Sequence, residues 1–171
     1  MTVLFDANIL IELLSPKTPV DRRDRLEYLV EQLQKDKIAI VVPAPSLTEL
    51  LAKAGKAREA YLATLDANKT IRIAPFGKRA ALECAMAMEK SIAAGDKRGG
   101  AKSTWAKAKF DRQIVAIAEV EGAKIIYSDD GDILKYCRPY GIEVRITADL
   151  PLPPHAAQGK LMFDLGEQPR V

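Results

Sequence analysis

The chain has 171 residues, of which 48% are hydrophobic and 29% are charged, and its formal net charge is +3. This length suits one domain, and this composition excludes the disordered, collagen-like and disulfide-scaffold classes of protein. Cys84 and Cys137 are too few for a disulfide framework or a thiolate zinc site. The single histidine, His155, follows a proline-rich stretch, which excludes histidine-based triads and zinc motifs and leaves carboxylates as the catalytic groups.

Positive charge is concentrated in the middle of the chain. Lys and Arg outnumber Asp and Glu by 14 to 6 in residues 51–112, whereas acids outnumber bases by 8 to 6 before this segment and by 9 to 6 after it. This arrangement places carboxylates beside a surface that attracts phosphate, although solvated lysines on helix faces explain the same counts. No apolar stretch approaches the about 20 residues that cross a bilayer, and the N-terminus lacks the basic start of a signal peptide, so we expect a cytoplasmic protein.

Short apolar runs alternate with helical patterns along the whole chain. In chain order the pattern predicts a strand at 2–5, helices at 9–14 and 21–35, a strand at 38–42, helices from 46 and at 56–68, a strand at 71–73, helices at 76–94 and 107–121, a strand at 124–127, a helix at 130–137 and a strand at 142–144. The strand runs are short and rich in β-branched residues, as in parallel sheets covered on both faces. We therefore predict an α/β fold with a central, mostly parallel sheet flanked by helices.

Three segments have special patterns. Residues 46–49, Ser-Leu-Thr-Glu, have the form of a capping box that opens a helix. Residues 95–103 are rich in glycine and basic residues and predict a mobile loop. After residue 147 the chain contains several prolines and loses its periodicity, so we predict one domain over residues 1–147 and a C-terminal tail or oligomer arm over residues 148–171.

Acidic residues fall at the ends of the predicted strands or at the starts of the following helices. They are Asp6, Glu49, Asp111, Asp129, Asp130 and Asp132. Ligands of an open parallel sheet bind beyond the carboxyl ends of its strands, so these acids are candidates for one site. Structural interpretations remain open for most of them: Asp6 as a helix cap, Glu49 as part of the capping box, and residues 129–132 as a turn.

Asp111 is the acid with the weakest structural interpretation. It lies at the N-terminal end of an apolar helical stripe, where a buried carboxylate requires a cation or hydrogen-bond donors, and no Lys or Arg is assigned to it. Several converging carboxylates repel one another and have raised pKa values until a divalent cation enters. Hard oxygen ligands in this number suit Mg²⁺ or Mn²⁺ better than zinc.

Four segments of the sequence carry a resemblance to a known family. They are VLFDANIL at residues 3–10, SLTEL at 46–50, FDRQIVAIA at 110–118 and IIYSDDGDI at 125–133. In this order and spacing, over residues 1–145, the chain resembles the PIN-domain family, and within it the VapC-type toxin ribonucleases of bacterial toxin–antitoxin modules. The resemblance implies a single PIN-like α/β domain.

Matched position by position, the resemblance implies which residues form the site. The catalytic and metal-binding acids would be Asp6, Glu49, Asp111 and Asp130. Asn8 and Ser128 match supporting polar positions, Asp132 matches a frequent additional acid, and Asp129 is the variable position between them. The glycine-rich segment at 95–105 and the long C-terminal tail depart from the family pattern.

The resemblance also implies an activity and partners. The activity is hydrolysis of RNA phosphodiester bonds with Mg²⁺, or Mn²⁺, as cofactor, leaving a 5′-phosphate and a 3′-hydroxyl. The implied partners are an antitoxin whose cationic side chain covers the acids and a second copy of the chain, docked through the apolar face of the second or third helix. Candidates for holding the RNA backbone are Lys97, Arg98, Lys102, Lys107 and Arg112. Trp105 either stacks on a base or anchors the core.

Two other functions are compatible with the sequence. A phosphohydrolase of the haloacid-dehalogenase type would use Asp6 as its nucleophile and Asp129 with Asp130 as Mg²⁺ ligands, but Asn8 cannot serve as the general acid of that chemistry. A non-catalytic domain that binds RNA or protein is the second alternative. It has no need for a group of mutually repelling carboxylates, which argues against it.

Overall fold

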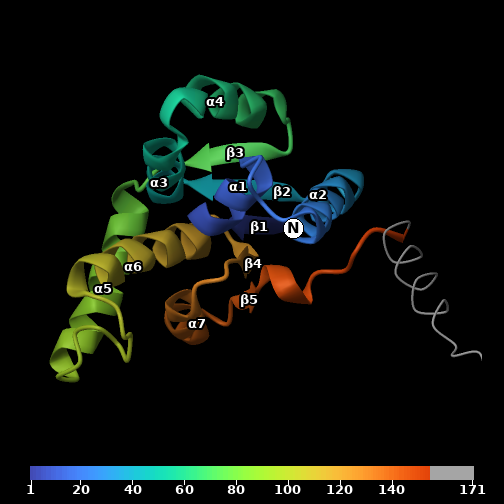
Figure 1. Cartoon of the computed structure of the whole chain (residues 1–171). Coiled ribbons are helices and arrows are strands. Elements are labelled where there is room, and N and C mark those ends of the chain that lie inside the picture. Colours follow the sequence, from blue (N-terminus) through green and yellow to red (C-terminus); the bar gives the residue numbers. More distant parts are fainter. Residues whose placement is uncertain (155–171) are drawn as a thin grey trace, which may run out of the picture.

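The computed structural model describes residues 1–154 of the chain as one five-stranded sheet with helices around it (Figure 1). The strands are β1 (Thr2–Phe5), β2 (Ala39–Pro43), β3 (Ile71–Ala74), β4 (Ala123–Tyr127) and β5 (Glu143–Arg145). The helices are α1 (Ala7–Leu14), α2 (Val20–Lys35), α3 (Ala44–Ala54), α4 (Arg58–Ala67), α5 (Lys78–Ala93), α6 (Trp105–Val120) and α7 (Gly131–Cys137). Short 3₁₀ turns occupy η1 (Gly55–Ala57), η2 (Arg138–Tyr140) and η3 (Thr147–Asp149).

All neighbouring strands pair in parallel, in the order β3-β2-β1-β4-β5. The central strand β1 is buried on both faces because successive side chains of a strand point to opposite sides. Val3 and Phe5 belong to one apolar cluster and Leu4 belongs to the other. Burial of each such side chain stabilises the fold by about 1.5–3 kcal/mol relative to exposure. The predicted fold class, an α/β domain with a parallel sheet, is therefore confirmed.

Helices cover both faces of the sheet. Side chains of α1, α2, α3 and α4 pack on the face that carries Val3 and Phe5, and side chains of α5, α6 and α7 pack on the face that carries Leu4. Helices α5 and α6 lie side by side and extend beyond the sheet in Figure 1. Among residues 1–154, no helix combines the length and the apolar content that crossing a membrane requires.

Most element boundaries agree with the sequence patterns to within a few residues, and the start of α3 is the main difference. The capping box predicted at residues 46–49 is wrong, because α3 already begins at Ala44, after Pro43, with Pro45 in its first turn. Proline suits this position since it has a helical φ and no N–H that needs a partner. The hydroxyl of Ser46 is thereby free for another partner.

The C-terminal part of the described chain stays close to the sheet. Thr147 and Leu150 are buried, and Leu150 packs in the cluster on the α1 and α2 face. The predicted tail at 148–171 lies mostly outside the described residues, and so does His155. The domain boundary at residue 147 therefore stays a prediction.

The chain order of the strands creates a switch point at the carboxyl edge of the sheet. From β1 the chain moves to β2 and β3 on one side, and it then crosses back to β4 and β5 on the other side. In open parallel sheets the crevice at such a point is the usual place for a ligand. Asp6 follows β1 and Ser128 follows β4, so both residues border this crevice.

Candidate metal centre at the carboxyl edge of the sheet

Asp6 is held at the end of β1 by neutral hydrogen-bond donors. Its side chain is the N-cap of α1 and accepts a bond from the backbone N–H of Ala7, with 2.6 Å between N and Oδ1. Ser46 donates to the same oxygen at 3.1 Å, and Ser128 donates to Oδ2 at 2.8 Å. Only 5% of Asp6 is exposed. The carboxylate is therefore fixed in one orientation by partners from three different segments of the chain.

Asn8 and Ser128 connect this carboxylate to the loop after β4. The Asn8 amide donates to Asp6 Oδ2 at 3.1 Å and to Ser128 Oγ at 3.2 Å. In return, Asn8 Oδ1 accepts the backbone N–H of Asp129, and Ser128 Oγ accepts the backbone N–H of Asp130. Both residues lie where the sequence pattern expected supporting polar groups. They fix the distance between Asp6 and the segment that carries Asp130.

The charge environment of Asp6 is unfavourable for an isolated carboxylate. Burial raises the pKa of Asp6, the hydrogen bonds from Ser128, Ala7 and Ser46 lower it, and the charge of Glu49 raises it again. Burial has the largest effect, so the net direction is upward. A cation at this position would stabilise the charged form.

Asp111, Asp130 and Asp132 form a second group of acids. One carboxylate oxygen from each lies within 4.8 Å of the others. Asp111 comes from α6 and is only 5% exposed, whereas Asp130 is the N-cap of α7 and Asp132 lies in its first turn. The pKa of Asp111 is raised to about 6, chiefly by burial and also by the charges of Asp130 and Asp6, against the lowering effect of Lys107. Acids that are remote in sequence thus act on one another here.

Lys107 is one of two lysines that pair with this second group, and its position corrects one expectation. Its ammonium nitrogen lies 2.7 Å from Asp111 Oδ2 and also pairs with Asp130. Burial disfavours the ammonium, but the hydrogen bonds and charges of both acids outweigh burial and raise the pKa of Lys107. The expectation that no Lys or Arg serves Asp111 was therefore wrong. The role of Lys107 in binding the RNA backbone stays a prediction. The separation of Lys107 and Asp111 by one helical turn is the signal that pointed to this pair.

Glu49 lies at the edge of the site rather than inside it. Its side chain is 43% exposed and pairs with Lys53 one turn later in α3, with 2.6 Å between the two atoms. Its charge still raises the pKa of Asp6. Ser46, three residues earlier, donates to Asp6 instead of capping a helix. Sequence analysis missed this role of Ser46.

Asp129, in the loop after β4, and Asp132, in the first turn of α7, bind different partners. Asp129 accepts from the backbone N–H of Thr147 at 2.7 Å and from its hydroxyl at 3.0 Å, and it also pairs with Arg22. It therefore ties the loop to the segment after β5 and to α2. Asp132 remains in the acidic group, with Lys135 at 2.8 Å from Oδ1.

The residues that the sequence suggested for RNA binding lie in different surroundings. Arg112 is 6% exposed and faces away from the acids into a cavity between α5, α6 and α7. Trp105 is half-buried against the core, with the ammonium groups of Lys97 and Lys109 each 5.8 Å from its ring centroid, which favours the anchor interpretation. Residues 95–104 form a loop that packs on α7, since Arg98 and Gly100 accept hydrogen bonds from Tyr136 and Lys135.

The donor set of the site fits a hard divalent cation. All candidate ligand atoms are carboxylate oxygens, and neither Cys84 nor Cys137 contributes a sulfur, because both thiols lie in the apolar cluster on the α5–α7 face. Oxygen ligands of this kind suit Mg²⁺ and Mn²⁺. Asp111 and Asp130 share a single lysine, so the group retains negative charge that an added cation would offset.

Comparison with known proteins gives one family and several similar structures. The PIN domain family matches residues 3–139. VapBC2 from Rickettsia felis, solved with a DNA fragment from its promoter, aligns with a TM-score of 0.61 at 18% identity over 85% of this chain and 98% of that chain. VapBC from Salmonella typhimurium, also solved with DNA, aligns with a TM-score of 0.56 at 17% identity over 86% of this chain and 98% of that one.

A third similar structure has a named target. VapC20 from Mycobacterium tuberculosis, described as a toxin that cleaves the sarcin–ricin loop, aligns with a TM-score of 0.52 at 14% identity over 77% of this chain and 92% of that chain. At such identities the structural likeness shows a shared fold. No protein with a curated function is similar enough in sequence to count as a relative.

Proposed function

Because the chain belongs to the PIN-domain family, we propose that it is a metal-dependent endoribonuclease and the toxin of a toxin–antitoxin pair. The observation that supports this proposal is the gathering of Asp111, Asp130 and Asp132, which have carboxylate oxygens within 4.8 Å of one another, with the charge of Asp6 acting on Asp111. These residues come from the end of β1, from α6 and from the start of α7. A domain selected for stability alone has no reason to gather carboxylates that repel one another.

The proposed metal ligands are Asp6, Asp111 and Asp130, with Glu49 and Asp132 beside them. Mg²⁺, or Mn²⁺ in its place, would lower the pKa of water and offset the charge that develops on the scissile phosphate. Ser46, Ser128 and Asn8 keep Asp6 in one orientation. Glu49 reaches solvent at the edge of the site, where a carboxylate can orient the attacking water and accept its proton.

Lys107 has a separate part in this proposal. In the structure its ammonium lies between Asp111 and Asp130 and offsets their repulsion. Its side chain is 44% exposed, so it can move outward into solvent when another cation takes its place. From there a lysine can contact the phosphate backbone of RNA.

The proposed partners are RNA as the substrate, an antitoxin protein and a second copy of the chain. The similar structures from Rickettsia felis and Salmonella typhimurium are VapBC complexes, and this supports an antitoxin partner. We propose that the antitoxin places a cationic side chain over the acids, where Lys107 lies now. A cytoplasmic location and a domain covering residues 1–147 agree with this proposal.

The haloacid-dehalogenase alternative has little support. The amide of Asn8 donates to Asp6 and Ser128, and it therefore assists the carboxylate as a hydrogen-bond donor and has no acidic proton to transfer. Asp129, a metal ligand in that alternative, is instead committed to Thr147 and Arg22.

An RNA cleavage assay tests the proposal. The purified protein with Mg²⁺ should cut a labelled single-stranded or structured RNA, and EDTA should stop the reaction. Asp6→Asn and Asp111→Asn should each lower the rate at least about a hundredfold because each removes a metal ligand. Asp66→Asn, an exposed change on α4, is the matched control.

The same experiment separates the remaining alternative from the proposal. Undiminished cleavage in EDTA would reject the metal mechanism. Stabilisation by Mg²⁺ in a thermal melt, combined with no cleavage of any RNA, would favour the non-catalytic binding domain.

A further inference from the structure

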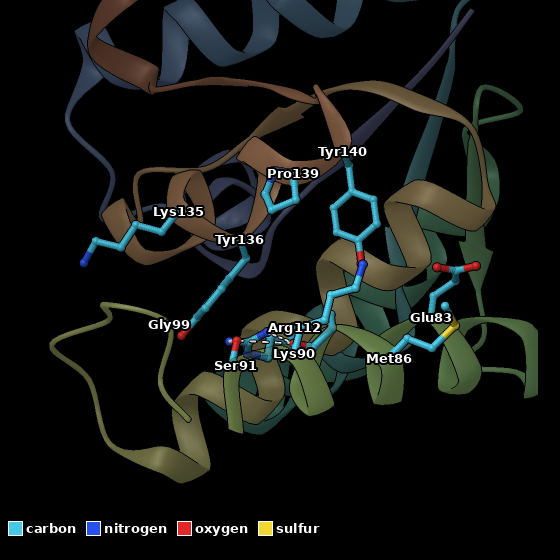
Figure 2. A pocket seen from close by; sticks show the side chains of 11 residues that line it. Glu83, Met86, Lys90, Ser91, Gly99, Arg112, Lys135, Tyr136, Pro139 and Tyr140 are labelled. Carbon is cyan, nitrogen blue, oxygen red and sulfur yellow. Dashed lines mark hydrogen bonds between the residues drawn. The ribbon is translucent and has the colours of Figure 1, made fainter. Parts of the chain in front are cut away.

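A cavity of about 290 Å³ lies between α5, α6 and α7 (Figure 2). Arg112 of α6 forms part of its wall, together with Lys90 and Ser91 of α5 and Tyr136 of α7. The glycine-rich loop closes one end, since Gly99 lines the cavity there, and Glu83 lies at the opposite end (Figure 2). The loop that departs from the family pattern thus helps to form this cavity.

Arg112 is a buried cation without an acidic partner. It is 6% exposed, and no carboxylate among residues 1–154 lies within ion-pair distance of its guanidinium. Nη1 donates to the backbone oxygen of Ala87 at 3.1 Å, and Nη2 donates to Ser91 Oγ at 2.6 Å. Nε is buried and has no hydrogen-bond partner within the described part of the chain. Buried charges are normally paired, so the charge of Arg112 favours an anion at this place.

The guanidinium is held in position by groups that do not neutralise it. It lies over the ring of Tyr136, with 4.5 Å between its central carbon and the ring centroid. On another side it meets Gly99, where an added Cβ would lie only 2.7 Å from Nη2 and where φ is +60°. Glycine is therefore required for this close approach of the loop. The guanidinium is therefore fixed in the wall of the cavity while it keeps its positive charge.

The cavity adjoins the acidic site. Arg112 directly follows Asp111 in α6; Asp111 pairs with Lys107, whereas Arg112 contacts the neutral groups of Ala87 and Ser91. Lys135, whose stem lines the cavity, donates from its ammonium to Asp132 at 2.8 Å and to the backbone oxygen of Gly100 at 2.9 Å. A chain of contacts thus leads from the acids across α7 to the loop that closes the cavity.

We propose that the Arg112 cavity binds a phosphate group of the RNA on a nucleotide next to the cleaved bond, with Lys90 as a second contact at its entrance. This inference rests on the proposed ribonuclease function. Lys90 is exposed and extends along the cavity toward Tyr140 in Figure 2. The proximity of the acids favours a nucleic acid over an acidic protein segment, because a nucleic acid can reach both sites with one continuous strand.

Binding of small molecules to the full-length protein tests the phosphate contact. Calorimetry should show that adenosine 5′-monophosphate binds at least about tenfold more tightly than adenosine, and Arg112→Gln should remove this preference. A thermal melt shows whether that variant is folded. Equal binding of the two compounds to the wild-type protein overturns the proposal. Binding of a glutamate-rich peptide in place of the nucleotide also overturns it and indicates a protein partner.

Cleavage kinetics with Mg²⁺ test whether the cavity contacts RNA. This test uses variants of exposed lysines, so it remains valid even if Arg112→Gln does not fold. Lys90→Glu should raise KM for RNA about three- to tenfold with little change in kcat, because an exposed phosphate contact contributes to binding. Lys78→Glu, the same charge change on α5 at a position outside the cavity, should leave KM unchanged. Equal KM values for the two variants overturn the proposal while the ribonuclease function stands. Absence of cleavage by the wild-type protein rejects the ribonuclease function, and the RNA assignment of the cavity with it.

Discussion

The candidate metal centre has two halves that hold their carboxylates by different means. At the end of β1, Asp6 accepts hydrogen bonds from neutral groups only, as far as residues 1–154 are concerned, and Ser46 and Ser128 are among these donors. At the junction of α6 and α7, Asp111 is held by the ammonium of Lys107. Neutral donors orient a carboxylate and leave its full negative charge, whereas a lysine orients it and also cancels charge.

The two halves of the site therefore differ in how freely their carboxylates can move. The Asp6 half is rigid because three of its four donors are buried: Ala7 in α1, Ser46 in the first turn of α3 and Ser128 directly after β4. The half with Asp111 is adjustable because the cation that pairs with it is on a long, partly exposed side chain. A metal ion can therefore find one ligand already oriented, and it can displace Lys107 to reach the other.

The largest expected effect comes from loosening the rigid half. Ser128→Ala removes the hydroxyl that donates to Asp6 and accepts from the backbone of Asp130. We expect RNA cleavage to fall about 10–100-fold, as is usual when a group that orients a metal ligand is lost. The assay is the initial rate of RNA cleavage at saturating Mg²⁺. Thr48→Ala, which removes an exposed hydroxyl from α3, is the control.

A Ser128→Ala protein that cleaves RNA at the wild-type rate would contradict the rigid description of this half. In that case the other donors to Asp6 would suffice to orient it.

The second-largest expected effect is a decrease in Mg²⁺ affinity at low pH, caused by protonation of Asp111 in the adjustable half. The pKa of Asp111 is raised to about 6, chiefly by burial, so this carboxylate is charged above that pH and protonated below it. Because a metal ligand must be deprotonated, Mg²⁺ affinity should fall about tenfold between pH about 7 and pH about 5. Isothermal titration calorimetry with Mg²⁺ at the two pH values measures this change.

The metal-free protein should show the opposite trend. The folded-state pKa of Asp111 lies above its ordinary value of 3.8, so the folded protein binds the proton more tightly than the unfolded chain. The contribution of Asp111 to the free energy of unfolding should therefore increase as pH falls from about 6 toward about 4. Urea titrations in EDTA of the wild-type protein and Asp111→Asn isolate this contribution. Equal pH dependence of the two proteins would show that Asp111 is not the titrating group.

Removal of the lysine should have the smallest effect, and it should increase metal binding. Lys107→Met keeps most of the side-chain volume and removes the ammonium that competes for the oxygens of Asp111 and Asp130. We expect Mg²⁺ affinity to rise about two- to tenfold, the scale of a partly exposed ion pair. The rise in melting temperature on adding Mg²⁺ should be larger than in the wild-type protein, because the metal-free variant has lost its internal cation.

Lys109→Met, on the same helix, controls for the general loss of one positive charge. Weaker Mg²⁺ binding by Lys107→Met than by Lys109→Met would show that the lysine supports the metal site and does not compete with it.

Part of this site could be predicted from local sequence patterns. Apolar runs of β-branched residues mark the strands; Asp6 directly follows one such run, and Asp130 lies three residues after the end of another. In a parallel sheet every carboxyl end points to the same edge, so acids at these ends must lie near one another. Asp111 was predicted because a carboxylate on an apolar helical stripe has to face the interior.

Other contacts depend on how the helices pack, and local patterns do not contain this information. Ser46 looked like a helix cap because its neighbours fit a capping box, but the prolines before it move the start of α3 to Ala44. Arg112 looked like an exposed phosphate ligand, and it is buried because α5, α7 and the loop at 95–104 all pack around it.

The sequence by itself determined the α/β class, the order of the elements and the edge of the sheet at which the acids gather, because each follows from periodicity along the chain. Only the tertiary structure decided which atoms meet there: Ser128 with Asp6, and Lys107 with both Asp111 and Asp130. The physical reason is that a side chain's partner depends on the rotation and spacing of packed elements, which are set by the whole core and not by neighbouring residues.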